Sequence, residues 1–554
     1  MELIKQYTDK IDHLILVHTH PRWEGPRLEF MPEDVYTGWA RKLHLIDHQV
    51  KYTIDPEHYL HPQVSDYHLL HHKSHAACAF YRSGFDDAVA VVADGAGSLI
   101  PLKFDDELVG CFEVESIYDC SYPDNLQLLY KHYATTGDYS TNLIKNFPNT
   151  TWKEDGTHEA LISSSAGITK VYEAVTSFCG FDGIEAGKTM GLFPYGKPND
   201  KIPDFFATVG EITTSNKNFF VPKYPATAII NHSIVPFLHE TQDWAGDLTQ
   251  MQNRRDMAYA CQKQTQEQLL NLIRKAVKMS GKKNVVLSGG YGLNCVANYY
   301  YLEQLKDEGI NLYVEPISND GGTAIGAAFL YYYQTTASLE KQPADIYLGP
   351  QRTYTEQQIE DSVNKVGGSI TDATNADVVK LMRGKNIVTI FQGRSENGPR
   401  ALGNRSVIFD PTFVDGKDYV NGIKHREYFR PFAGSILQDH VHDWFDLRGM
   451  DSSPHMMYAV NCKDGVAEKI PSIIHEDGTC RIQTVTRDEN PHYYDLITEF
   501  YNQTGVPVVF NTSFNLGGDP LVETLDDALE TLAKSDIEYL YLPEYNKLIK
   551  VANS

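Results

Sequence analysis

The sequence lacks the cysteine spacing and the long apolar runs that define several classes of protein. Its eight cysteines are scattered over 554 residues without one CxxC pair, which argues against a zinc ribbon and against a disulfide framework. No apolar run reaches the roughly 18 residues that a membrane helix needs, and residues 1–6 show no signal-peptide core. We therefore expect a cytoplasmic protein that does not interact with a membrane.

Positive charge is also scarce. The chain carries 49 Lys and Arg against 73 Asp and Glu, which gives a formal net charge of −24. Because such a chain repels the phosphates of a duplex, we expect no tightly held nucleic acid, although a local basic pocket for a nucleotide is compatible with this balance. The hydrophobic content of 42% is that of a globular protein, and the length suggests roughly three or four units of core-forming size.

The stretch 68–97 contains candidate metal ligands. His71 and His75 lie four residues apart, so on a helix both imidazoles project from the same face. The apolar run 88–93 predicts a strand buried on both faces, which would place Asp94 at its carboxyl end, before a turn at Gly95. Clustered surface histidines without a metal are the alternative, because the chain has 21 His and the motif lacks the glutamate of HExxH.

A second carboxylate follows an equivalent strand. Residues 312–314 predict a short strand, after which Asp320 precedes two glycines and an alanine-rich helix. Two carboxylates in equivalent positions, together with two histidines, form a set suited to iron, manganese or zinc. The sequence therefore predicts a metal site formed by His71, His75, Asp94 and Asp320.

Two glycine-containing segments are candidates for binding an anionic ligand. In the first, Gly187 and Lys188 follow a predicted helix over 167–180, and the glycine would let the backbone approach the ligand; a plain turn is the alternative. In the second, the predicted strand 284–287 leads through Gly289 and Gly290 to Asn294 and another helix. That arrangement directs backbone N–H groups at phosphates, although its spacing is neither a P-loop nor a dinucleotide fingerprint.

Arginine is concentrated beside glycine after the predicted strand 387–391. Guanidinium groups bind phosphate through two parallel hydrogen bonds, so this concentration in an acidic chain predicts an anion pocket near the strand-like segment 511–513. A solvated basic face is the alternative. The basic residues concerned are Arg394, Arg400, Arg405, Lys424, Arg426, Arg430, Arg481 and Arg487.

These motifs resemble those of the nodulation-type and antibiotic-tailoring O-carbamoyltransferases. The matching segments follow the family's order and are 71–76, 187–192, 288–290, 319–322, 396–406, 424–433 and 511–515. The resemblance implies an α/β protein with two lobes. Residues 1–340 would form an actin-like, ribonuclease-H-like lobe that transfers the carbamoyl group, 341–352 a linker, and 353–554 an α+β lobe similar to threonylcarbamoyl-AMP synthase that forms carbamoyl-adenylate.

The resemblance also implies the chemistry and the residues that perform it. The protein would make carbamoyl-adenylate from carbamoyl phosphate and ATP, and would transfer the carbamoyl group to a hydroxyl of a small acceptor such as a sugar, natural product or nucleoside. Its metal would be Fe(II) or another divalent transition metal, with Mg also considered, and homodimer formation stays open. The implied catalytic residues are Lys424, Arg430, Arg481 and Ser513. The implied cofactor-binding residues are Gly187, Lys188, Gly289, Gly290, Asn294, Arg400 and Asn511.

One part of the family pattern is expected to be missing. Members usually begin with a strand and a glycine-rich turn that contains His-Asp, and this sequence shows no such turn. The alternatives are a catalytically degraded metal-binding partner protein and a tRNA threonylcarbamoyl transferase. A relative from hydrogenase maturation is disfavoured, because the CxxC zinc repeats expected of it are absent.

Overall fold

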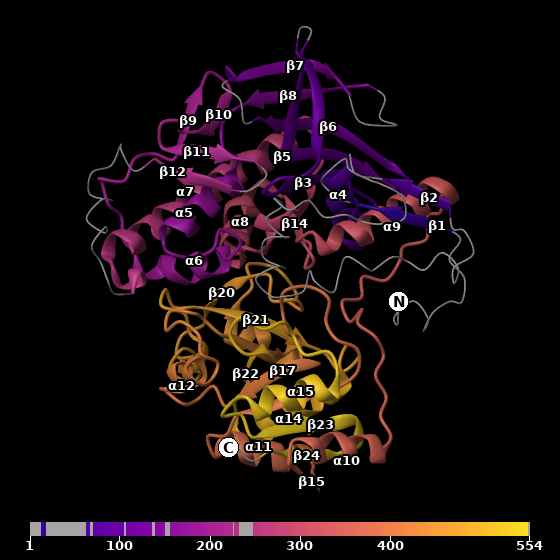
Figure 1. The fold of residues 1–554 in the computed structure, drawn as a ribbon, viewed down its shortest axis with the longest axis vertical. Coiled ribbons are helices and arrows are strands. Elements are labelled where there is room, and N and C mark those ends of the chain that lie inside the picture. The colour runs from indigo at the N-terminus through magenta and orange to yellow at the C-terminus, as the bar shows by residue number, and fades with distance from the viewer. Residues whose placement is uncertain are drawn as a thin grey trace. The chain divides into compact units, whose positions relative to one another are not determined.

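The structure is a computed structural model that describes residues 13–17, 63–66, 70–104, 107–135, 139–149, 156–224, 227–231 and 247–551. The chain divides into two compact units, the first ending at Ala344 and the second beginning at Asp345 (Figure 1). Each unit combines a large sheet with helices, so the mixed α/β class predicted from the sequence is confirmed at that level.

An eight-stranded sheet forms the centre of the first unit, in the order β14-β13-β3-β5-β6-β8-β7 with β4 paired to β5. Strands β14, β13 and β3 run parallel, so their carboxyl ends lie at the same edge of the sheet. The turns that carry Asp94, Gly289 and Asp320 all follow these three ends. The strands are β3 (Asp87–Ala93), β4 (Leu99–Phe104), β5 (Glu107–Ser121), β6 (Asn125–Ala134), β7 (Asn142–Pro148), β8 (Thr157–Ser163), β13 (Asn284–Ser288) and β14 (Asn311–Val314).

Three two-stranded pairs accompany this sheet. They are β1 (His13–Leu16) with β2 (Gln63–Asp66), β9 (Phe206–Val209) with β10 (Ile212–Ser215), and β11 (Phe220–Lys223) with β12 (Thr227–Ile230). The first pair is parallel and the other two are antiparallel.

The helices of the first unit include one that is buried along its whole length. All twelve residues of α4 are buried, and α4 packs against α9 and the strand β3. On another part of the sheet, α5 packs against α6 and α7. The helices are α4 (His71–Arg82), α5 (Ile168–Phe178), α6 (Ala186–Leu192), α7 (Gln252–Ser280), α8 (Cys295–Leu305) and α9 (Gly321–Thr336).

A ten-stranded sheet forms the second unit, in the order β15-β24-β23-β16-β17-β22-β18-β21-β20-β19. Threonine N-caps with reciprocal capping boxes begin three of its helices, α10, α11 and α15. The strands are β15 (Ser369–Asp372), β16 (Val388–Phe391), β17 (Arg405–Phe409), β18 (Ala433–Leu437), β19 (Phe445–Asp446), β20 (Ala459–Cys462), β21 (Thr479–Val485), β22 (Val508–Ser513), β23 (Tyr539–Leu542) and β24 (Lys547–Lys550). The helices are α10 (Glu356–Lys365), α11 (Asn375–Arg383), α12 (Gly416–Ile423), α13 (Val441–Trp444), α14 (Pro491–Thr504) and α15 (Leu525–Ala533).

Candidate functional site

The four predicted metal ligands lie together at the carboxyl edge of the first sheet. His71 and His75 project from the same face of α4, with ring centroids 4.8 Å apart. The His71 Nε2 atom lies 3.3 Å from Asp94 Oδ2 and 3.5 Å from Asp320 Oδ1, and His75 Nε2 also lies 3.5 Å from Asp320 Oδ1. One donor atom from each of the four residues therefore falls within 4.8 Å of the others.

The donor set fits a divalent transition metal. The buried Nε2 atom of His75 has no hydrogen-bond partner in the described part of the chain, and its Nδ1 atom lies 3.4 Å from the Ser288 hydroxyl. A second contact of this kind fixes the orientation of metal-binding imidazoles. Burial lowers the pKa of His71, but the hydrogen bonds and charges of Asp320 and Asp94 outweigh it and raise that pKa to about 10. The two carboxylates thus favour a positive charge at this point, which a metal ion would supply while displacing the proton.

A buried ion pair holds the beginning of α4. Its N-cap residue Leu70 offers no side-chain hydrogen bond; instead Glu113 of β5 accepts from the backbone N–H groups of His72 (3.4 Å) and Ser98 (2.9 Å). Burial raises the pKa of Glu113, but the Lys131 ammonium bonded to it outweighs burial and lowers the pKa to about 2. Glu113 therefore stays ionised and ties α4 to the turn after Asp94.

The glycine pair predicted to bind phosphate contacts one of the predicted metal ligands. The backbone N–H of Gly290 donates to Asp94 Oδ1 at 3.1 Å. Gly289 has a φ of 89°, and a Cβ there would overlap the carbonyl group of Ala93. Asn294 caps α8 by accepting from Ala297 N–H at 3.1 Å, and its amide N–H₂ donates to Gln262 at 2.9 Å. These contacts support the turn and the helix from within.

The segment around Lys188 is not a glycine-rich turn. Residues 186–192 form the helix α6, so the interpretation of this segment as a loop is wrong. The reason is that α6 packs against α5 and α7, which offsets the cost of a glycine in the helix. Lys188 pairs with Glu185 one turn earlier at 2.8 Å.

A cationic cluster is present in the second unit. Burial and the charges of Arg426 and Arg430 hold the pKa of Lys424 well below its usual range. Burial and the neighbouring Arg430, Arg481 and Arg400 likewise lower the pKa of Arg426. The charges of these basic residues thus act on Lys424 and Arg426, and we call Arg400, Lys424, Arg426, Arg430 and Arg481 the cationic cluster.

Strand β22 contributes the polar groups beside this cluster. The Lys424 ammonium donates to the carbonyl oxygen of Ser513 and, at 3.3 Å, to Asn515 Oδ1. The Ser513 hydroxyl donates to the same Asn515 oxygen at 2.7 Å. Arg481 of β21 has a buried Nε atom without a hydrogen-bond partner among the described residues. The predicted catalytic residues Lys424, Arg430, Arg481 and Ser513 are thus near one another.

Three arginines of the predicted pocket lie in other surroundings. Arg405 is fully buried and donates to the carbonyl oxygens of Gln392 (2.5 Å), Asn404 (3.0 Å) and Gly393 (3.2 Å). Arg394 donates to the carbonyl oxygen of Gly349 at 2.7 Å. Arg487 forms an ion pair with Asp495 while its side chain is 60% exposed. The sequence could not separate these three residues from the cationic cluster.

Two further residues lie near the predicted ones but were not among the residues implied to be catalytic or cofactor-binding. Arg426 belongs to the cationic cluster and donates to the Thr512 hydroxyl at 3.3 Å. Glu396 accepts from the backbone N–H groups of Leu402 (2.7 Å) and Asn404 (2.9 Å), and so holds the loop that carries Arg400. The predicted cofactor residue Asn511 is fully buried and donates to Ala401 O at 3.1 Å and Ser435 Oγ at 2.9 Å. It supports the same loop.

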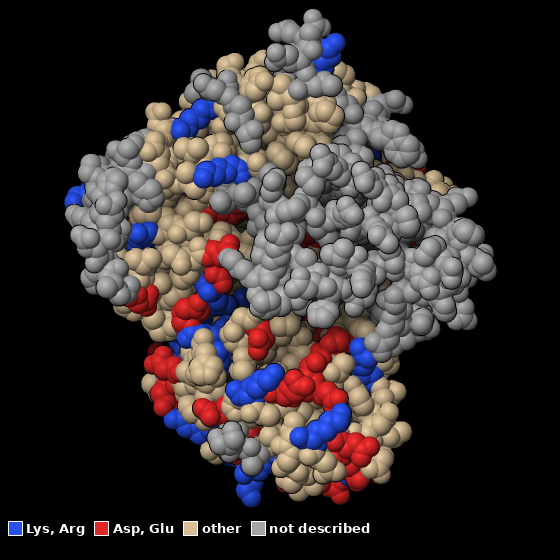
Figure 2. Space-filling view, in the orientation of Figure 1, with Lys and Arg blue, Asp and Glu red and all other residues tan. Residues whose placement is uncertain are grey.

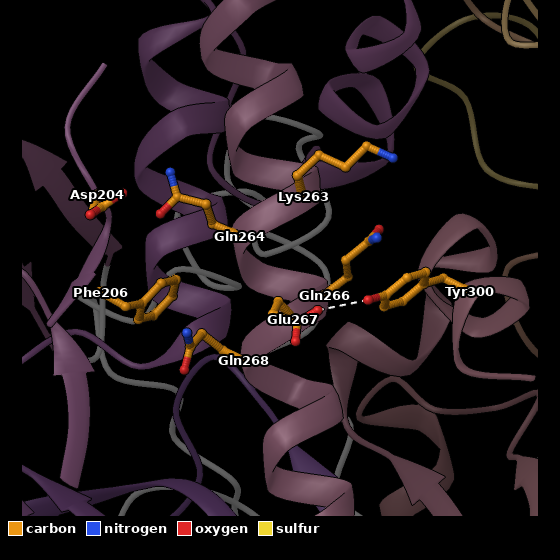
Figure 3. A pocket seen from close by; sticks show the side chains of 8 residues that line it. All are labelled: Asp204, Phe206, Lys263, Gln264, Gln266, Glu267, Gln268 and Tyr300. Atoms are coloured by element: carbon orange, nitrogen blue, oxygen red, sulfur yellow. Dashed lines mark hydrogen bonds between the residues drawn. The ribbon is translucent and has the colours of Figure 1, made fainter. Parts of the chain in front are cut away.

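A recess of about 480 Å³ lies beside α7, and the Tyr300 hydroxyl donates to Glu267 within it at 2.7 Å (Figure 3). None of the predicted site residues lines it. On the face drawn in Figure 2, acidic and basic side chains are interspersed over the described surface of the second unit. In the described ranges, no helix is both long and apolar enough to cross a membrane.

Comparison with known proteins gives consistent matches over most of the chain. Residues 42–329 match the family model described as carbamoyltransferase N-terminus, and residues 379–548 match carbamoyltransferase C-terminus. The uncharacterized protein sll1178 of Synechocystis sp. is 31% identical over 511 residues, which cover 86% of this chain and 75% of that protein. Nodulation protein NolO of Bradyrhizobium diazoefficiens is 30% identical over 486 residues, which cover 85% of this chain and 77% of that protein.

A solved structure of full-length HypF in a phosphate- and nucleotide-bound form is a far more distant match. It aligns with 52% of this chain at 14% identity and a TM-score of 0.29, and the chain spans 38% of the HypF length. Ligands of HypF therefore carry no implication for the sites described above.

Proposed function

Because the chain belongs to the carbamoyltransferase family, it is a carbamoyltransferase, and we propose that it forms carbamoyl-adenylate from carbamoyl phosphate and ATP and transfers the carbamoyl group to a hydroxyl. We assign formation of the adenylate to the second unit and transfer to the first. The acceptor would be a small hydroxylated molecule such as a sugar, natural product or nucleoside.

The cationic cluster is the observation that carries this proposal. Five basic side chains, at least two of them largely buried, gather in a chain whose net charge is −24. Burying like charges costs free energy unless an anion is bound among them. Carbamoyl phosphate and the triphosphate of ATP are anions of the required kind, and guanidinium groups bind their oxygens bidentately.

The same side chains suit the chemistry of adenylate formation. Water first cleaves carbamoyl phosphate into carbamate and phosphate. As a carbamate oxygen then bonds to the α-phosphorus of ATP, the bond to pyrophosphate breaks and negative charge grows on the phosphate oxygens. Fixed cations that already face these oxygens stabilise that charge without reorganising. Lys424, held by Ser513 and Asn515, would bind the carbamoyl or phosphate oxygen, and Arg481 would bind through its unpartnered Nε–H group.

The first unit would perform the transfer. His71, His75, Asp94 and Asp320 would hold the metal, with Fe(II) the first candidate, and the bound ion would act as a Lewis acid toward the carbonyl oxygen. Glu113 and Gly290 keep two of these ligand-bearing segments in place. Transfer forms a bond between the acceptor oxygen and the carbamoyl carbon, and AMP leaves.

The purified chain with ATP and carbamoyl phosphate tests the proposal. Mass spectrometry should detect carbamoyl-adenylate, together with AMP and pyrophosphate. Arg481→Ala should abolish the adenylate while bound metal stays unchanged, and Arg487→Ala should retain it, because Arg487 lies on the exposed surface. A folded wild-type chain that forms no adenylate would refute the assignment of the second unit.

A further inference from the structure

A second buried ion pair lies at the other end of the helix that carries the two histidines. The Arg82 Nε atom donates to both carboxylate oxygens of Glu315, at 3.1 and 3.2 Å. The two side chains are only 2% and 0% exposed. Arg82 is the last residue of α4 and lies two turns beyond His75, whereas Glu315 directly follows β14 and precedes Asp320 by five residues.

Glu315 organises the turn that ends at Asp320. Besides Arg82, its carboxylate accepts from the Tyr313 hydroxyl at 3.1 Å and from the backbone N–H of Ile317 at 3.0 Å. The Ser318 hydroxyl donates to the carbonyl oxygen of Glu315. This single carboxylate therefore joins the helix of His71 and His75 to the turn that presents Asp320.

We propose that Arg82 and Glu315 are positioning residues that set the distance of Asp320 from the two histidines. The inference rests on the metal site of the proposed function. Stability alone does not account for the pair, because apolar or neutral replacement of a buried ion pair is often neutral or stabilising. Asp320, by contrast, is 34% exposed on the side chain. The Arg82–Glu315 pair restrains the turn that carries this partly exposed carboxylate.

If Arg82 and Glu315 position Asp320, the melting temperature and the affinity for metal should respond differently to substitution. If the pair were purely structural, both quantities should change together. Arg82→Met alone leaves a buried carboxylate unpaired and should lower the melting temperature by roughly 10 °C. Adding Glu315→Gln removes the charge and keeps an acceptor for Ile317, so the melting temperature should return close to the wild-type value. Affinity for metal should not return, because the amide no longer holds the turn to α4.

Co²⁺ alone is the probe, added to the full-length chain. In the double variant R82M/E315Q, the Co²⁺ dissociation constant should rise about 10- to 100-fold, the usual effect of losing an outer partner of a metal ligand, and the visible absorption band should shift. The matched control is R274M/E308Q, which removes an ion pair of similar type whose side chains are 40% and 37% exposed. This control should bind Co²⁺ as wild type does.

A double variant with recovered melting temperature and wild-type Co²⁺ affinity and spectrum would overturn the proposal. If the double variant does not fold, Arg82→Lys keeps the charge but loses the two-pronged contact, and it should weaken Co²⁺ binding several-fold; unchanged affinity in that variant overturns the proposal as well. A wild-type chain that fails to bind Co²⁺ would refute the proposed metal site itself, which is a distinguishable result.

Discussion

At the scale of single residues, the two sites place their charged groups under opposite electrostatic conditions. In the first unit, Asp94 and Asp320 face two imidazoles, and the charges of His71 and His75 hold the pKa of Asp94 below its usual range despite burial and the neighbouring Asp320. In the second unit, burial and two arginines lower the pKa of Lys424. The first arrangement favours binding of a cation and the second favours binding of an anion.

The pKa of Lys424 predicts how substrate binding depends on pH. An ordinary lysine stays protonated up to its usual pKa of 10.5, but Lys424 loses its proton at lower pH, so the KM for carbamoyl phosphate should rise as pH increases through the lowered pKa. Below that pKa the cation is present and KM should be constant. Lys424→Arg, which stays charged, should show a flatter profile over the pH range in which Lys424 titrates. Parallel wild-type and variant profiles would contradict the role of Lys424.

The lowered pKa of Lys424 also makes the free energy of unfolding depend on pH. Between the lowered pKa and 10.5, the unfolded chain holds a proton on Lys424 that the folded chain has lost. The contribution of this residue to the free energy of unfolding therefore rises with pH across that window. Saturating carbamoyl phosphate should reduce the rise, because a bound anion favours the protonated lysine. A difference between the pH dependence of stability with and without carbamoyl phosphate would distinguish titration of Lys424 from other effects of high pH on stability.

Two arginines of the second unit should respond differently to truncation. Arg405→Met removes four hydrogen bonds to backbone carbonyl oxygens, so we expect a loss of about 3 kcal/mol in the free energy of unfolding, measured with urea. Arg481→Ala should lose adenylate formation and keep its stability within about 1 kcal/mol. If Arg405→Met keeps full stability, its assignment as a structural residue is wrong.

At the scale of elements, close contact between α4 and α9 supports the proposed metal site. A Cβ at Gly326 would overlap the carbonyl oxygen of Ser74, and one at Gly322 would lie 3.3 Å from Cys78 Sγ. The two glycines are four residues apart and face α4, so the helix backbones approach closely. Asp320 stands immediately before α9, and its distance from His75 therefore depends on this contact.

Gly326→Ala tests the helix contact. The added methyl group must push α9 away from α4, so we expect a loss of about 1–3 kcal/mol in stability and weaker Co²⁺ binding. Gly187→Ala is the matched control, because Gly187 has open space around it in α6, and alanine there should stabilise by about 0.5–1 kcal/mol. Equal effects of the two substitutions, measured by urea denaturation and Co²⁺ titration, would show that the contact is not tight.

The sequence predicts the helix and strands around the proposed metal site better than it predicts the glycine-containing segment 186–192. The helix of His71, the strand 88–93 and the strand before Asp320 are confirmed as α4, β3 and β14, because apolar runs and the spacing of the histidines report burial directly. The glycine content of residues 186–192 is typical of a loop, but these residues form α6, which packs against α5 and α7. Likewise, the sequence showed many arginines together, and only the contacts of Arg405 identify it as structural.

At the scale of the whole molecule, each unit has its own sheet and its own buried core. The cluster that includes Phe80, Val92 and Leu330 belongs entirely to the first unit. In the second unit, apolar side chains such as Phe510 and Leu540 are fully buried within the ten-stranded sheet. Because the metal ligands lie in one unit and the cationic cluster in the other, ligands of the two sites should stabilise different parts of the chain.

Differential scanning calorimetry of the full chain should therefore show two transitions that respond to different ligands. A ligand present at 100 times its dissociation constant adds about 2.7 kcal/mol to the state that binds it. Co²⁺ should raise one transition by several degrees, and ATP with carbamoyl phosphate should raise the other. His75→Ala should remove the response to Co²⁺ alone, whereas Arg481→Ala should remove only the response to the anions. One transition that both ligands shift equally would contradict the division of the two activities between the units, since the stabilisation would then be shared across the chain.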